Sequence, residues 1–364
     1  GNNMRSVYIH IPFCKSICSY CDFCKFYYKE SWALSYMEVL KDEILKYYEE
    51  DDIKSIYIGG GSPSSLSIDC LEKLFEIIKV FKVSNDCEIT FECNVNDINE
   101  ELLKILKINN VNRISIGVQS FNKKKLKYLN RNHNKKQIIN NIKLCKSYGF
   151  DNINVDFMYA LPIETYRMMK SDLKKFLKLK IEHISTYSLI IEYHTVLKNI
   201  KAKPLNEDLE YKMYKYILKK TKKYGFKHYE VSNFALNNHE SIHNKTYWKN
   251  EEYYGFGLSS HGFINGVRYE NTRNFNKYLN GDYRLNELLV STEEDMENEV
   301  MLGLRLMDGI SISHFKEKFG YSIDKIFKIK EAIKKGYLIK ENDYIKIPEN
   351  KIYVMNEIIN FIME

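Results

Sequence analysis

The sequence predicts an α/β fold with one parallel β-sheet, followed by a smaller, mostly helical domain. From residue 7 to residue 189, short apolar strand-like runs alternate with amphipathic helical segments, which is the rhythm of βα units. Chemically distinctive residues fall where predicted strands end. This position favours a barrel over a doubly wound sheet, because the active sites of barrels form at the carboxyl ends of their strands. From about Ser291 the pattern changes to short helices and one hairpin.

The composition fits a large domain plus a smaller one. The chain has 364 residues, of which 44% are hydrophobic, so a sizeable core is possible. The net charge of +7 is mild and spread along the sequence, and nucleic-acid binding is not expected without clustered basic charge. No apolar run approaches the roughly 20 residues of a membrane span, so we expect a cytoplasmic protein without a transmembrane segment. Residues 1–4 are interpreted as a tag remnant and the initiator Met.

The predicted strands and helices follow one another in pairs. The first strand runs from Val7 to Ile11 and ends at Pro12, which has no backbone N–H for a ladder. Further core strands are predicted at 55–59, 88–93, 113–118, 152–157 and 183–189. The helices between them are predicted at 31–50, 68–82, 99–109, 122–130, 135–148 and 165–180. We therefore assign residues 5–206 to the core barrel.

The second half of the chain completes the barrel and adds the smaller domain. Residues 207–290 hold a helix at 208–225, a strand at 227–234, a polar segment at 235–253 and a hairpin turn at Asn265-Gly266. Residues 291–364 hold helices at 292–307, 311–319, 323–336 and 352–363 and a hairpin around Asp343. Helices combined with a hairpin in this way predict a winged-helix-like domain.

Four of the eight cysteines crowd into one loop after the first strand: Cys14, Cys18, Cys21 and Cys24. Three thiolates at C-x3-C-x2-C on one loop suit an iron–sulfur cluster. With only three ligands, one iron keeps an open position for a substrate or cofactor. The alternative is a structural zinc site with Cys24 or His10 as the fourth ligand, but zinc sites usually combine two separate C-x2-4-C pairs. The remaining cysteines stand singly in apolar contexts, as buried free thiols do.

Two further patterns indicate ligand binding at strand ends. Gly59-Gly60-Gly61-Ser62-Pro63 follows the second strand, where glycines let the backbone and its amides approach a ligand closely. Glu92, Gln119 and Asp156 close the third, fourth and fifth strands. Packing explains a polar side chain at the end of a buried strand poorly. The glycines could instead form a tight turn, and the polar residues could be helix caps or solvated strand ends.

The cysteine loop resembles that of the radical S-adenosylmethionine (SAM) proteins, whose signature is C-x3-C-x-aromatic-C, with Tyr20 at the aromatic place. The flanking Tyr8-Ile-His-Ile-Pro-Phe-Cys14 and Cys21-Asp-Phe are similar to the oxygen-independent coproporphyrinogen III oxidase-like family. The resemblance implies an incomplete (β/α)6 TIM-like barrel. It also implies a 4Fe-4S cluster on Cys14, Cys18 and Cys21, SAM as cofactor, and an electron donor such as flavodoxin or ferredoxin.

The resemblance further implies a SAM-binding set. Its members are Tyr8, Tyr20, Gly60, Gly61, Ser62, Glu92, Gln119, Arg131 and Asp156. The glycine-rich stretch would bind the amino end of SAM, and Arg131 its carboxylate. Glu92 and Asp156 would bind the ribose hydroxyls, Gln119 would line the pocket, and Tyr8 would lie near the sulfonium. In such proteins the cluster passes one electron to SAM, whose cleavage yields a radical that abstracts hydrogen from a substrate.

A second stretch, His243-Asn-Lys-Thr-Tyr247-Trp248, resembles the H-N-x-x-Y-W motif of the haem-chaperone (HemW) branch. This implies that residues 207–290 include a porphyrin- or haem-related segment, with His243, Tyr247 and Trp248 binding haem for delivery to an acceptor protein. The enzyme branch, which decarboxylates coproporphyrinogen III to protoporphyrinogen IX, has a fourth cysteine two residues after the third, where Phe23 stands. The decarboxylase is nevertheless the second hypothesis. The third hypothesis is a non-catalytic zinc- or DNA-binding protein. For residues 243–248 alone, the alternative is a surface loop with Tyr247 and Trp248 packed inward.

Overall fold

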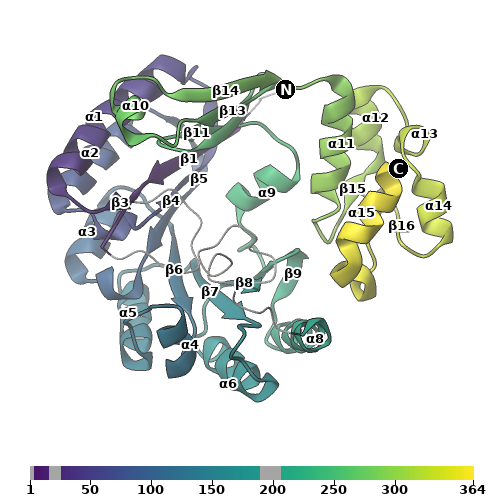
Figure 1. The fold of residues 1–364 in the computed structure, drawn as a ribbon, viewed down its shortest axis with the longest axis horizontal. Coiled ribbons are helices and arrows are strands. Elements are labelled where there is room, and N and C mark those ends of the chain that lie inside the picture. The colour runs from purple at the N-terminus through teal and green to yellow at the C-terminus, as the bar shows by residue number, and fades with distance from the viewer. Residues whose placement is uncertain (1–3, 16–25, 189–205) are drawn as a thin grey trace.

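The computed structural model describes residues 4–15, 26–188 and 206–364. Six strands pair in parallel in chain order and confirm the predicted βα core. They are β1 (Arg5–Ile11), β4 (Asp52–Gly60), β5 (Lys82–Cys93), β6 (Arg113–Gln119), β7 (Ile153–Tyr159) and β8 (His183–Ser188). The sheet curves, with helices on its outer side (Figure 1). Its described strands do not close into a ring, since β9 and β14 form its two edges. This is the predicted incomplete barrel.

The described part of the core holds six helices, and all but the first begin at a side-chain cap. They are α1 (Glu30–Tyr47), α2 (Ile68–Ile78), α3 (Glu100–Ile108), α4 (Lys123–Tyr128), α5 (Lys135–Ser147) and α6 (Tyr166–Leu177). The side chains of Ser67, Asn99, Asn122, Asn134 and Thr165 each accept a hydrogen bond from a backbone N–H of the first helical turn. All six of these helices are shorter than predicted, because each ends before its predicted last residue.

Both edges of the sheet differ from the prediction. On one side β11 (Tyr253–Phe256) pairs in parallel with β1, and the antiparallel strands β12 (His261–Ile264), β13 (Val267–Asn271) and β14 (Arg284–Leu289) extend it. On the other side α8 (Glu207–Lys223) leads into a tight hairpin in place of the single predicted strand at 227–234. This hairpin consists of β9 (Lys227–Glu230) and β10 (Asn233–Ala235). The strand breaks because the Glu230 carboxylate accepts a hydrogen bond from the backbone N–H of Ser232 at 2.6 Å.

The segment 235–253, expected as a polar stretch, contains the helix α9 (Ile242–Trp248). The Ser241 hydroxyl caps this helix by accepting from the backbone N–H of Asn244. Figure 1 shows α9 inside the curve of the sheet, between β4 and the C-terminal helices. The predicted Asn265-Gly266 hairpin is confirmed, with φ of 51° and 77° at its two turn residues.

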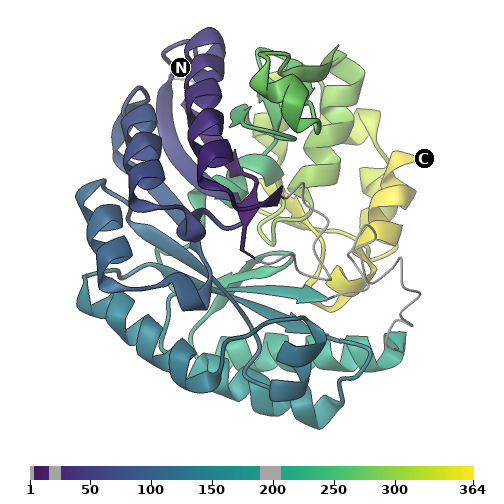
Figure 2. The ribbon, with the colours of Figure 1, turned by 60° about the vertical axis from the view of Figure 1, so that its left-hand side comes forward.

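The C-terminal region is mostly helical, as predicted. It contains α11 (Thr292–Gly303), α12 (Ile312–Phe319), α13 (Ile323–Ile326), α14 (Ile329–Lys334) and α15 (Met355–Met363). A small sheet of β15 (Ile310–Ser311), β17 (Tyr344–Lys346) and β16 (Ile339–Glu341) completes it. This region lies beside the open side of the barrel (Figure 2). Backbone hydrogen bonds from Val231 to Arg305 and from Met307 to Tyr229, both 3.0 Å, attach it to β9.

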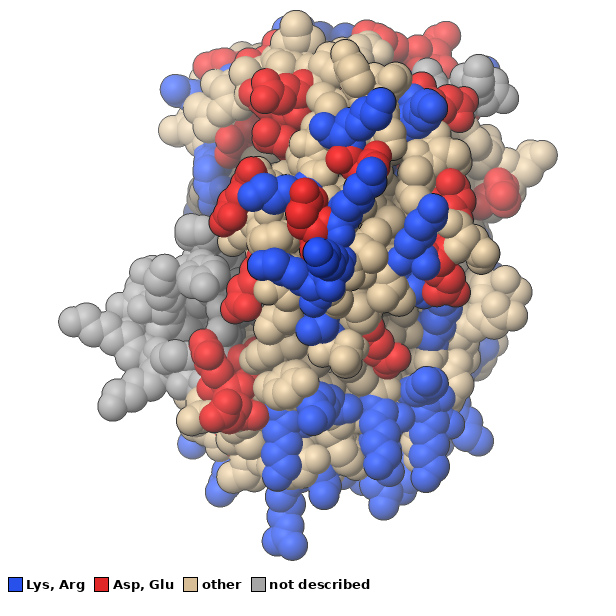
Figure 3. Space-filling view, turned by 90° about the vertical axis from the view of Figure 1, so that its right-hand side faces the viewer, with Lys and Arg blue, Asp and Glu red and all other residues tan. Residues whose placement is uncertain are grey.

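Charge is less evenly distributed than the sequence suggested. Lys and Arg side chains gather at the lower end of the face shown in Figure 3, where α8 lies. The exposed lysines on α6 and α8 include Lys170, Lys174, Lys212, Lys215, Lys219, Lys222 and Lys223. Within the described part of the chain, no helix is both long and apolar enough to span a membrane.

Candidate functional site

A cavity of about 760 Å³ opens where the parallel strands end. Of the residues predicted to bind SAM, all but Tyr20 line it: Tyr8, Gly60, Gly61, Ser62, Glu92, Gln119, Arg131 and Asp156. Tyr20 falls outside the described residues, as do Cys18, Cys21, Phe23 and Cys24. The strand-end side chains therefore converge on one cavity, as expected, for every member that the structure describes.

Cys14 lies at the root of the predicted cluster loop. It ends β2 (Phe13–Cys14), which pairs with β3 (Phe26–Tyr27) on the far side of the loop. The residue is buried, with 1% of its surface exposed. The loop therefore starts and ends at one short strand pair. Of the scattered cysteines, Cys70, Cys87, Cys93 and Cys145 are buried and free, as predicted.

The glycine-rich turn joins the cysteine strand to the cavity. The backbone N–H of Gly61 donates to the Ile11 carbonyl at 2.7 Å, and that of Ser62 donates to the Phe13 carbonyl at 2.7 Å. Gly60 has φ of 116°, and a Cβ there would lie 2.6 Å from His10 Nδ1. A Cβ on Gly61 would lie 2.6 Å from the Phe13 carbonyl oxygen. Only glycine fits at these two positions, so the turn can lie directly against the strand that carries Cys14.

Glu92 is held in a fixed orientation at the end of β5. Its Oε2 accepts from the Tyr57 hydroxyl at 2.6 Å, and its Oε1 accepts from the backbone N–H of Gly60 at 3.0 Å. The Tyr57 ring stacks on Tyr8 with 6.1 Å between ring centroids, and the Tyr8 hydroxyl lies 3.0 Å from His10 Nδ1. One row of polar and aromatic contacts thus connects β1, β4 and β5 along the cavity wall.

Asp156 lies in the middle of β7, not at its end as predicted, and places a second carboxyl group in the same cavity. Its Oδ1 accepts from Asn154 Nδ2 at 3.1 Å. Burial, and next the nearby charge of Glu92, raise the pKa of Asp156 to about 7. A strongly shifted carboxyl group in a cleft is typical of a functional site. Two carboxyl groups on β5 and β7, on either side of β6, would suit a ligand that offers hydroxyl donors or positive charge.

Gln119, at the end of β6 between these two strands, and Arg131, after α4, also line the cavity. Gln119 has a left-handed backbone with φ of 67°. Its Oε1 is buried without a hydrogen-bond partner among the described residues, and such an atom needs a partner from a ligand or water. The carboxyl groups, the glycine turn, this amide and the adjacent Cys14 fit the SAM and the cluster that the family resemblance implies.

The three residues of α9 that were predicted to bind haem do not all reach the cavity. Tyr247 lines the cavity, whereas His243 and Trp248 do not. His243 is 1% exposed, its Nδ1 lies 2.9 Å from the Ser55 hydroxyl, and its Nε2 hydrogen-bonds the Tyr247 hydroxyl. Burial, followed by the charge of Arg113, lowers the pKa of His243 to about 3, so the imidazole is neutral. Trp248 Nε1 donates to Glu230 Oε2 at 2.5 Å.

Several residues that shape the cavity were not predicted from the sequence. Tyr57 orients Glu92, and its position on a strand two residues before the glycines was the available signal. Tyr187, Tyr253, His261 and Arg273 also line the cavity. The last three come from β11, β12 and the loop after β13; of this region the sequence predicted only the hairpin at Asn265-Gly266.

Comparisons with known proteins identify the family of this chain. The Radical SAM superfamily matches residues 8–176, and the HemN C-terminal domain matches residues 290–353. The Heme chaperone HemW of Lactococcus lactis is 40% identical over 364 residues, covering 97% of this chain and 96% of its own. The Bacillus subtilis Heme chaperone HemW is 38% identical, with 98% of both chains covered. The Escherichia coli Heme chaperone HemW is 30% identical, again with 98% of both covered.

Among solved structures, the radical SAM enzyme coproporphyrinogen III oxidase (HemN) from Escherichia coli superposes with a TM-score of 0.86. It is 19% identical, and the match covers 99% of this chain and 90% of that one. This similarity shows a shared fold, while the sequence relationship to the HemW proteins is closer. The radical SAM family implies a 4Fe-4S cluster and SAM as cofactors. The chain belongs to the radical SAM superfamily and, within it, to the HemW family.

Proposed function

We propose that this protein is a haem chaperone, which binds haem at the radical SAM cavity and passes it to a haem-requiring acceptor protein. The observation that carries the proposal is the sequence relationship, over nearly the full length, to proteins named heme chaperones. The cavity geometry supports it, because the segment with the H-N-x-x-Y-W motif reaches the same cavity as the predicted SAM-binding set.

The residues of this chain would bind and orient the cluster and SAM. Cys14, Cys18 and Cys21 would hold the 4Fe-4S cluster, which supplies one-electron chemistry toward SAM when both are bound. An electron donor such as flavodoxin or ferredoxin would reduce it. The amides of the glycine turn would hold the amino end of SAM, and Glu92 and Asp156 its ribose hydroxyls. Arg131 would pair with the SAM carboxylate, and Gln119 would offer its buried Oε1 to the ligand.

On the haem side, Tyr247 would make the direct contact. It lines the cavity from α9, and its hydroxyl is fixed by the buried His243. Trp248 would hold the other end of α9 through Glu230. His243 and Trp248 would therefore take part in haem binding by keeping Tyr247 in place. A flat macrocycle is well matched by a wall of aromatic side chains, and Tyr8, Tyr187 and Tyr253 line the same cavity.

The first test is an anaerobic haem titration of the protein with its cluster reconstituted. We expect one haem per chain, followed by transfer to apomyoglobin as a generic acceptor. Tyr247→Ala should weaken haem binding at least tenfold, whereas Tyr224→Ala, at an exposed position at the end of α8, should not. Absence of haem binding by cluster-loaded wild-type protein would refute the proposal.

The second test addresses the decarboxylase hypothesis. The same protein is supplied with SAM, a reductant and coproporphyrinogen III under strict exclusion of oxygen. We expect no protoporphyrinogen, even where SAM is consumed. Formation of that product would make the oxidase the primary activity.

A further inference from the structure

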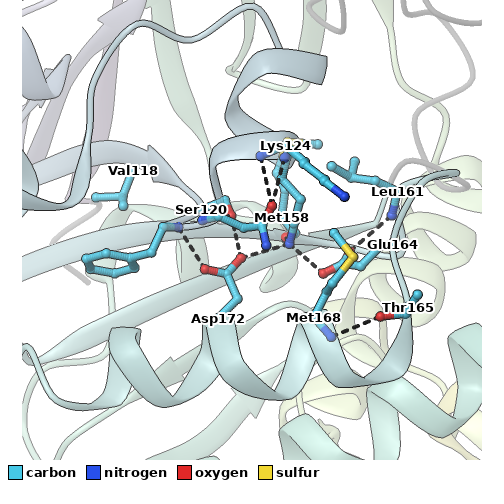
Figure 4. A network of polar contacts seen from close by, with 12 residues as sticks. Val118, Ser120, Lys124, Met158, Leu161, Glu164, Thr165, Met168 and Asp172 are labelled. Atoms are coloured by element: carbon cyan, nitrogen blue, oxygen red, sulfur yellow. Dashed lines mark hydrogen bonds and ion pairs between the residues drawn. The ribbon is translucent and has the colours of Figure 1, made fainter.

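A lysine in the predicted helical stretch 122–130 is completely buried. The side chain of Lys125 is 0% exposed, although its neighbours Lys123, Lys124 and Lys127 are also lysines. Its Nζ donates to the Met158 carbonyl at 2.7 Å, to Glu164 Oε2 at 2.6 Å and to Asp172 Oδ2 at 2.9 Å. An ammonium group has three N–H donors, so all of them are used. Figure 4 shows the acceptors Met158, Glu164 and Asp172 around one point beneath α4.

The two carboxylates extend these contacts to neighbouring strand ends. Asp172 Oδ2 also accepts from the Ser120 hydroxyl at 2.5 Å, and Oδ1 accepts from the backbone N–H of Phe121 at 2.7 Å. Glu164 Oε1 accepts from the backbone N–H of Leu161 at 3.2 Å. A single ammonium group therefore links α4 and α6 to the chain segments that leave β6 and β7. We call Lys125, Glu164, Asp172 and Ser120 the ammonium network.

The segments joined by this network form one wall of the cavity. Gln119, directly before Ser120, and Met158, whose carbonyl accepts from Lys125, both line it. Arg131 also lines it, and its backbone N–H donates to the Leu126 carbonyl of α4 at 2.8 Å. Gln119 and Ala160 have left-handed backbones, with φ of 67° and 60°. Non-glycine residues keep this conformation only where surrounding contacts impose it.

Stability alone does not explain a fully buried group of one cation and two carboxylates. Removing these charges from water costs free energy that their mutual attraction offsets incompletely, and well-packed apolar side chains often serve equally well. Directional hydrogen bonds, in contrast, can fix where two chain turns lie. Prearranged binding residues improve affinity by reducing the ordering that binding requires.

We propose that Lys125 is a positioning residue for SAM: it holds the turns after β6 and β7 so that Gln119, Met158 and Arg131 face the ligand before it binds. The inference rests on the proposed SAM site and assigns a role to a side chain that does not reach the cavity itself.

The test compares SAM affinity with fold stability in cluster-loaded protein, by equilibrium dialysis of labelled SAM and by urea unfolding. Lys125→Met keeps the length of the side chain and removes the charge; we expect at least tenfold weaker SAM binding. The triple variant Lys125→Met/Glu164→Gln/Asp172→Asn leaves no unpaired buried charge. We expect it to regain stability relative to Lys125→Met without regaining affinity. Ile362→Ala, at a position 1% exposed in α15, should lower stability and leave SAM affinity unchanged.

A double-mutant cycle with Gln119→Ala separates positioning from general loosening. If Lys125 acts through Gln119, the combined variant should lose little more affinity than the stronger single variant. Unchanged SAM affinity in the triple variant would overturn the inference, and losses that multiply in the cycle would overturn its claim about Gln119. Failure of the wild-type protein to bind SAM would instead refute the proposed SAM site.

Discussion

Replacing Asp156 by asparagine should stabilise the ligand-free protein, although it removes a predicted binding residue. The carboxyl group is held in the cavity with Glu92 nearby, and its pKa is raised from 3.8 to about 7. A raised carboxyl pKa means that the folded state binds a proton more tightly than the unfolded state. The resulting stability is complete below the unfolded-state pKa of 3.8 and is lost as pH rises through about 7. Asparagine keeps the oxygen that accepts from Asn154 and carries no charge.

The size of the pKa shift of Asp156 sets the expected difference in the free energy of unfolding. At about 1.4 kcal/mol per pH unit, a displacement of about three units corresponds to roughly 4 kcal/mol at pH 8. Asp156 is partly exposed to the cavity, so water screens part of this cost and we expect about half, or ~2 kcal/mol. Most of that difference should develop between pH 5 and pH 8.

Urea unfolding of the wild-type and Asp156→Asn proteins, both free of ligand, measures the difference at pH 5 and pH 8. The variant should be more stable at pH 8, and its advantage should shrink toward pH 5. Asp151→Asn, on an exposed residue just before β7, is the matched control and should change stability little at either pH. A variant that is less stable than wild type at pH 8, or an advantage independent of pH, would refute the electrostatic reasoning.

Three further substitutions test other parts of the structure. Gly60→Ala should destabilise the fold by about 1–3 kcal/mol and abolish SAM binding, because its φ of 116° and the 2.6 Å approach to His10 exclude a side chain; wild-type thermal stability would contradict this. Burial raises the pKa of Glu43 to about 7, so its contribution to stability is present below pH 4.5 and lost toward pH 7. Glu43→Gln should therefore flatten the dependence of urea unfolding on pH in that range, and an unchanged profile would count against it. Trp248→Phe leaves the buried Glu230 without its indole donor and should cost about 1–3 kcal/mol in urea unfolding, whereas Trp32→Phe at a 40% exposed site should cost less; equal costs would contradict this.

The sequence predicted the parallel core and the meeting of Glu92, Gln119 and Asp156 because both follow from local rules. Alternating strand and helix patterns imply a parallel sheet, and the carboxyl ends of parallel strands meet at one edge. The strand β11 was not predicted because it is four residues long and its partner β1 lies far from it in the sequence, with Ser6 paired with Tyr253. No pattern within a short window contains that pairing.

Two other features were also not predicted from the sequence, because each depends on contacts made by single side chains. The helix α9 contains His, Asn, Thr, Tyr and Trp, which favour helices weakly. It forms where Ser241 caps it and Glu88 accepts from the backbone N–H of His243 at 3.2 Å. Lys125 looks like its solvated neighbours, and only the converging Glu164 and Asp172 distinguish it.

The raised pKa of Asp156 also has a consequence for ligand binding. SAM carries positive charge on its sulfonium and amino groups, and a cation in this cavity favours ionised carboxyl groups. Binding should therefore release a proton from Asp156 at pH values below about 7. We expect the SAM dissociation constant of cluster-loaded protein to increase as pH falls from 7.5 to 6, by up to about tenfold per pH unit. Asp156→Asn should bind SAM more weakly at pH 7.5 and with little dependence on pH. A wild-type affinity that does not change over this range would show that Asp156 remains ionised in the free cavity or that SAM does not contact it.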